Sequence, residues 1–159
     1  MEHITDLLLE AREELKRLEH IIYVSLKYTR TVDVIINALD RLIDVYNLTI
    51  EALLEKAKDE NKVTVLPKSP ALRATRLTET YPEDLKLKKY LHFYSFLKTI
   101  LNLPYERRRE YRRHVTLVVR LDKRTAEANI DNLTNCERYV HHFFDYAWEL
   151  VHGKKVEED

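Results

Sequence analysis

Apolar residues recur at steps of three and four along the first part of the chain, which is the spacing of an amphipathic helix. Thr5 and Asp6 can cap this helix, and we expect it to end near Tyr28. Its charged residues fall between the apolar ones, so they form a solvent-facing side. The predicted buried side consists of Leu8, Ala11, Leu15, Leu18, Ile22 and Leu26.

A second helical pattern begins at Thr31 and continues to Ala57. Its apolar face is broader than that of the first helix, so it needs neighbours on more than one side. Because only Thr29 and Arg30 separate the two patterns, the sequence predicts an antiparallel helical hairpin. The main apolar positions are Ile35, Leu39, Leu42, Tyr46, Ile50 and Leu53.

The helical pattern breaks between residues 61 and 83, a stretch that holds three of the four prolines. We expect an irregular connection here, and a connection of this length is often functional or mobile. Neither flank could bury a core alone. Residues 1–159 are therefore predicted to form a single domain.

A third helix is predicted to open at Pro82–Asp84 and to stop at Asn102. A fourth is predicted to begin at Pro104, because proline suits the first turn of a helix, and to run through Leu121. The β-branched residues from His114 to Val119 are also typical of a strand. With no evident pairing partner and no hairpin turn, helix is the favoured interpretation.

The last helix is expected to begin at Asp122 or Thr125 and to end at His152, with Gly153 as its stop and a frayed tail after residue 153. The predicted fold is therefore all-α, an up-and-down bundle of four to five helices. A single glycine in the chain agrees with this, because hairpins and bulges need residues that tolerate positive φ.

Composition excludes several function classes. One glycine cannot supply the phosphate-binding loops of P-loop NTPases or Rossmann dehydrogenases, so no nucleotide cofactor is predicted, and no other cofactor either. The 27 basic and 27 acidic residues balance, so nucleic-acid binding has to be argued from where the charges lie. Glutamine is absent and Lys, Arg and Glu are abundant, which is typical of thermophile proteins and also of long-helix proteins.

The lone Cys136 cannot form an internal disulfide. The first twenty residues are charged throughout and lack the apolar core of a signal peptide. No apolar run approaches the roughly 20 residues of a membrane-spanning helix. We therefore expect a cytoplasmic protein without membrane contact.

The segment from residue 105 to 114 is the strongest candidate for chemistry. On a helix, Glu110 and His114 are neighbours four residues apart, and Arg109 lies near the same side. The glutamate could orient the imidazole, His114 could transfer protons, and Arg109 could stabilise a charged phosphorane-like transition state. The residues predicted to guide phosphates are Arg107, Arg108, Arg112 and Arg113.

The spacing of Arg109 and His114 resembles the Arg-x4–6-His motif of the HEPN superfamily, small helical bundles that include toxin and defence ribonucleases. That family often has an aromatic residue two positions after the histidine, where this chain has Thr116. The resemblance implies an RNA-binding or RNA-cleaving module and, if an enzyme, a metal-independent ribonuclease. Arg109, Glu110 and His114 would be its catalytic residues. The broad apolar faces of the first two helices predict a homodimer, which could set two sites across a shared groove.

Two alternatives stay open. The arginines could form only ion pairs at an assembly interface, as in a non-catalytic homo-oligomeric interaction protein. The last helix could instead bind a metal through His142 and Asp145, with Glu149 and His152 in the Glu-x-x-His pattern of di-iron bundles. That chemistry normally needs two such motifs, and the sequence holds one, so no metal site is predicted.

Overall fold

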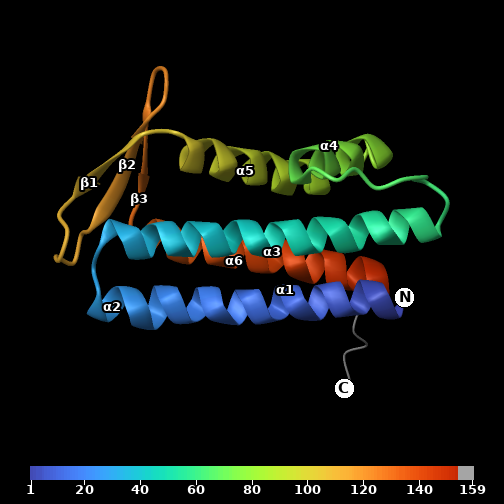
Figure 1. The fold of residues 1–159 in the computed structure, drawn as a ribbon, viewed down its shortest axis with the longest axis horizontal. Helices are drawn as coiled ribbons and strands as arrows, with labels where there is room; N and C mark the ends of the chain where they lie inside the picture. The colour runs from blue at the N-terminus through green and yellow to red at the C-terminus, as the bar shows by residue number, and fades with distance from the viewer. Residues whose placement is uncertain (154–159) are drawn as a thin grey trace.

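The computed structural model describes residues 1–153, and the predicted frayed tail lies outside them. A long helical rod comes first: α1 (Glu2–His20) continues through a π-helical turn, η1 (Ile21–Ser25), into α2 (Leu26–Tyr28). The rod ends at Tyr28, as the sequence predicts. Helix α3 (Val32–Asp59) returns alongside it (Figure 1), so the predicted antiparallel hairpin is confirmed.

The turn between the two rods is set by local chemistry. Thr31 caps α3, because its Oγ1 accepts a hydrogen bond from the backbone N–H of Val34 at 3.4 Å. Further along, Arg41 of α3 donates to Glu14 of α1 at 2.8 Å, an ion pair that joins the rods. The apolar stripes of both rods are buried, as their spacing predicts.

Two further helices cover this hairpin, α5 (Leu85–Asn102) and α6 (Ile130–His152). Tyr46 of α3 lies at their junction, with its ring centroid 5.2 Å from that of Tyr94 on α5 and 5.0 Å from that of Phe143 on α6. Asp84 caps α5 by accepting from the backbone N–H of Leu87. The predicted stop at Asn102 is confirmed.

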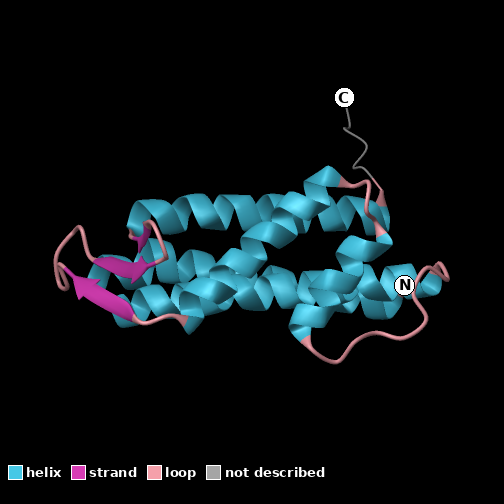
Figure 2. Cartoon of the chain, turned by 90° about the horizontal axis from the view of Figure 1, so that it is seen from above, coloured by secondary structure: helices cyan, strands magenta, loops and turns pink. Residues whose placement is uncertain are grey.

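The segment predicted as irregular from 61 to 83 contains a helix, α4 (Pro70–Thr80), so that part of the prediction is wrong. Proline at the first helical position costs no hydrogen bond, because that N–H has no partner within the helix. Ala74 and Leu77, three residues apart, then bury one side of α4. The connection on either side of α4 is irregular, as expected (Figure 2).

The predicted fourth helix is wrong. Residues 105–128 form an antiparallel sheet at one end of the bundle, of order β1 (Tyr105–Arg108), β2 (Thr116–Arg120) and β3 (Thr125–Ala128) (Figures 1 and 2). The β-branched residues of β2 find partners on both sides, since Val119 pairs with Tyr105 of β1 and with Ala126 of β3. The molecule is thus mostly helical with an added three-stranded sheet in its described part, rather than all-α.

The start predicted for the last helix is also wrong, because residues 125–128 belong to β3. Helix α6 begins at Ile130 behind a capping box, in which Asn129 and Asn132 each accept a hydrogen bond from the backbone N–H of the other. Its end at His152, followed by Gly153 with a φ of 82°, is confirmed. None of the described helices has the length and apolar character required to cross a membrane.

Candidate functional site

The candidate residues lie in the connection between β1 and β2 rather than on a helix. Residues 109–114, here called the basic loop, reverse the chain without glycine: Arg109 and Tyr111 have φ values of 53° and 67°. The backbone N–H of Tyr111 donates to the carbonyl of Arg30 at 2.6 Å, and that of Arg112 donates to the carbonyl of Arg109 at 3.2 Å. The first bond holds the loop against the link between α2 and α3, and the second closes a turn within the loop.

The arginines of the strands are paired with acids. Arg107 donates to Asp33 of α3 at 2.8 Å and to Glu110 at 3.4 Å, and the hydrogen bond to Asp33 raises the pKa of its guanidinium further above the usual value. Arg108 and Arg120 both reach Glu106, each at 3.2 Å. The ion-pair interpretation therefore describes these arginines well.

The cations of the basic loop are arranged differently. Arg109, Arg112, Arg113 and His114 are all exposed. Across residues 1–153, no carboxylate lies within ion-pairing distance of any of them, and none of their side chains makes a hydrogen bond. Tyr111, in the middle of the loop, is 80% exposed. The loop thus presents uncompensated positive charge around a solvent-facing aromatic ring.

The predicted catalytic group does not have helical geometry. Glu110 and His114 are not on successive turns of a helix, and Glu110 pairs with Arg107. Within the described part of the chain, no hydrogen bond or ion pair connects Arg109, Glu110 and His114 to one another. All three residues lie on one short loop, so they lack the helical spacing that was predicted to bring their side chains together.

The polar residues predicted as metal candidates on α6 are dispersed. His142, Asp145, Glu149 and His152 are exposed, and the ring of His152 lies 4.3 Å from that of Trp148. A neighbouring set converges instead: Glu137 and His141 of α6 meet Glu19 of α1. Glu137 and His141 are spaced i,i+4, a signal present in the sequence, whereas the approach of Glu19 depends on how the two helices pack.

Comparison with known proteins adds no relative. No family model matches the chain, and neither a curated protein nor a solved structure matches it. The resemblance to the HEPN superfamily rests on the spacing of Arg109 and His114 and on the helical part of the fold. The RNA partner, the homodimer and the thermophile character stay predictions.

Proposed function

We propose that this protein is an RNA-binding module that contacts the phosphate backbone through the basic loop. One observation carries the proposal: three arginines and a histidine are exposed on one short loop with no acidic partner in the described chain. The chain as a whole is neutral, so this local excess of positive charge arises because basic residues are grouped on the loop away from acidic ones. An unpaired guanidinium can bind phosphate bidentately.

Single-stranded RNA fits the loop better than a duplex. Proteins recognise single strands by combining cationic side chains with aromatic rings on which bases stack. Tyr111 supplies an exposed ring between Arg109 and Arg112, so a phosphate and its neighbouring base can be contacted together. Tyr90 and Tyr94, whose rings could also stack on bases in principle, are buried in the bundle instead.

RNA cleavage is a narrower form of the same proposal. His114 would act as general acid or base, and Arg109 would stabilise charge on the phosphorus centre. Both side chains face solvent on the same loop, which supports this form. Glu110 would not orient the imidazole directly, because it pairs with Arg107.

The test is binding of labelled single-stranded RNA, measured by fluorescence anisotropy at several salt concentrations. The variant R109A/R112A/R113A removes three loop arginines. The matched control R17A/R76A/R120A also removes three exposed arginines, but each of these lies outside the loop and pairs with a glutamate. We expect the loop variant to bind at least about tenfold more weakly and to reduce the slope of log affinity against log salt by about 2, since single strands lose roughly 0.7 per contact.

Equal effects in the two triple variants, or no RNA binding by the wild type at low salt, would rule out the proposal. Cleavage is tested separately by incubating the same RNA with H114A and R109A. Loss of cleavage in both variants, with circular dichroism unchanged, supports the catalytic form. Binding without cleavage by the wild type rejects the catalytic form and leaves the binding function standing.

A further inference from the structure

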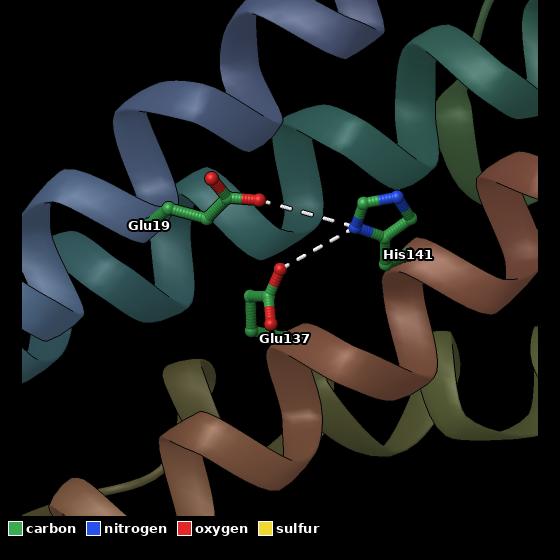
Figure 3. A group of neighbouring side chains, drawn as sticks. All are labelled: Glu19, Glu137 and His141. Atoms are coloured by element: carbon green, nitrogen blue, oxygen red, sulfur yellow. Dashed lines mark ion pairs between the residues drawn. The ribbon is translucent and has the colours of Figure 1, made fainter.

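Two carboxylates and one imidazole from opposite ends of the chain converge between α1 and α6 (Figure 3). His141 Nδ1 lies 3.6 Å from Glu137 Oε1 and 3.9 Å from Glu19 Oε1. Each of the three residues offers one ligand atom, and these atoms all lie within 4.8 Å of one another. We call this set the Glu-Glu-His cluster.

The cluster contains more negative charge than its surroundings balance. Its side chains are faced by one more acid, Asp145, 3.7 Å from His141 Nε2. Within residues 1–153, no lysine or arginine lies within ion-pairing distance of Glu19, Glu137 or Asp145, and the only basic side chain beside them is His141. A cation bound among these acids would offset the repulsion between their charges.

Glu137 shows this imbalance most clearly. Its side chain is only 7% exposed, and Figure 3 shows its carboxylate directed toward His141 and Glu19. Burial, and then the charge of Glu19, raise the pKa of this carboxyl, while the nearby imidazole of His141 acts in the opposite direction. A buried carboxylate is costly unless it is paired or coordinates a metal.

We propose that Glu19, Glu137 and His141 bind a divalent transition-metal ion of the Zn²⁺ type. An imidazole nitrogen with carboxylate oxygens suits Zn²⁺, Mn²⁺ or Fe²⁺, whereas Ca²⁺ and Mg²⁺ prefer oxygen ligands alone. Tetrahedral bonds of about 2.0–2.1 Å place neighbouring donor atoms roughly 3.3 Å apart. The two distances from His141 Nδ1, 3.6 and 3.9 Å, and the limit of 4.8 Å on all three separations are longer than this value, so side-chain rotations would have to draw the three ligand atoms together around the ion.

Asp145 is a positioning residue in this site. Metal-binding histidines commonly donate their second N–H to a carboxylate, which fixes the ring and its tautomer. With the Nε2 proton directed at Asp145, the lone pair of Nδ1 faces Glu19 and Glu137. The side chains of Glu19 and His141 are 42% and 45% exposed, so a bound ion keeps positions open to water.

The experiment uses the untagged full chain, stripped with a chelator and titrated with Zn²⁺ by calorimetry and with Co²⁺ by visible absorption. We expect one Zn²⁺ per chain in the wild type and at least about a tenfold loss of affinity in both H141A and E137Q. The glutamine variant removes a buried charge, so it should remain folded. The control H142A/E149Q changes the same residue types on the same helix, at exposed positions outside the cluster.

Asp145→Asn separates positioning from ligation. We expect it to weaken Co²⁺ binding by about 10- to 100-fold while the absorption spectrum at saturation keeps the wild-type shape. The proposal is overturned if the wild type binds no stoichiometric metal, or if H141A and E137Q bind as tightly as the wild type. It is equally overturned if the control variant loses as much affinity as these two.

Discussion

The two charged regions of this protein are built on different kinds of structure. The Glu-Glu-His cluster lies on the packed helices α1 and α6, so its positions are fixed by the same apolar contacts that fold the bundle. The basic loop lies at the tip of a small sheet and is held by a few backbone hydrogen bonds, including that from Tyr111 to Arg30. The cluster depends on the packed core, and the loop depends on a few backbone contacts.

This difference explains how a chain without net charge can offer two charged surfaces. The strand arginines and their acids cancel one another locally, as Arg108 and Glu106 do. Elsewhere charge of one sign gathers: acidic in the Glu-Glu-His cluster between the helices, and basic on the loop. The net charge of the chain reveals neither region. Changing the packed core and the loop anchor one at a time should therefore affect the two regions differently.

The largest expected effect comes from the support of the cluster. Phe143 on α6 is fully buried, and its ring lies against those of Tyr46 and Tyr90. Replacing it with alanine leaves a cavity at the centre of the bundle, so we expect F143A to lose about 3–5 kcal/mol in the free energy of unfolding. Urea denaturation followed by circular dichroism measures this loss.

Phe96 on α5 provides the matched control, because the same truncation there removes a ring that is 37% exposed. We expect F96A to lose clearly less stability than F143A. Similar losses in the two variants would show that the junction of α3, α5 and α6 is not the main support of the bundle.

The second prediction concerns the anchor of the basic loop. Tyr111→Pro removes the N–H that donates to Arg30 and imposes a φ near −65° where the chain has 67°. We expect a local loss of about 2–3 kcal/mol. It should appear as faster amide exchange in residues 109–115 and weaker RNA binding, with the helices of the bundle retaining their protection.

Tyr111→Gly is the control for the anchor, since it keeps the N–H and tolerates positive φ. It removes only the exposed ring, so amide protection of the loop should persist. Protection lost equally in the proline and glycine variants would show that the aromatic ring holds the loop, and that the backbone bond to Arg30 does not.

The same contrast describes what could be predicted from the sequence. The helices with strong apolar periodicity and clear caps were predictable, because Thr31 and Asp84 cap their helices through purely local bonds. The sheet was not, because its strands are short and its turn places Arg109 and Tyr111 at positive φ without glycine. The strained backbone of those residues is stabilised by contacts with a distant part of the chain, such as the bond from Tyr111 to Arg30. The sequence pattern around the loop does not reveal such contacts.

The two candidate sites also differ in how far local sequence signals indicate them. The loop residues became candidates because arginines are dense there, although the helix predicted for them was wrong; their role stays a prediction. The Glu-Glu-His cluster was not predicted, because the sequence pattern places Glu19 on the solvent-facing side of the first helix. Only the packing of α1 against α6 shows that it meets Glu137.

The third prediction concerns how the buried Tyr94 makes stability depend on pH. Tyr94 is 1% exposed and donates to Asn47 at 2.5 Å, and burial raises the pKa of its phenol to about 12. In the unfolded chain a phenol ionises near about 10, so the unfolded state loses a proton first as pH rises. The free energy of unfolding is therefore unaffected by the ionisation of Tyr94 below about pH 10. It falls by about 2 kcal/mol as the pH rises from there to about 12.

Tyr94→Phe removes this titration, so the stability advantage of the wild type over the variant should shrink between about pH 10 and 12. Urea denaturation at several pH values measures the difference. Parallel stability curves for the two proteins would contradict the assignment of this loss to Tyr94.

The smallest expected effect concerns an ion pair between the helical bundle and the sheet that carries the basic loop. Asp33, in the first turn of α3, accepts from Arg107 at 2.8 Å and so connects a bundle helix to the sheet. The two side chains are 72% and 40% exposed, and an ion pair this open to water is screened and adds little to stability. Asp33→Asn should therefore change stability little, but it releases Arg107 beside the basic loop. We expect RNA to bind slightly more tightly at low salt, and the gain to vanish as salt screens the charge. Tighter binding that persists at high salt would mean that Asp33 acts by shaping the loop, and the boundary between the two regions would then lie within α3 itself.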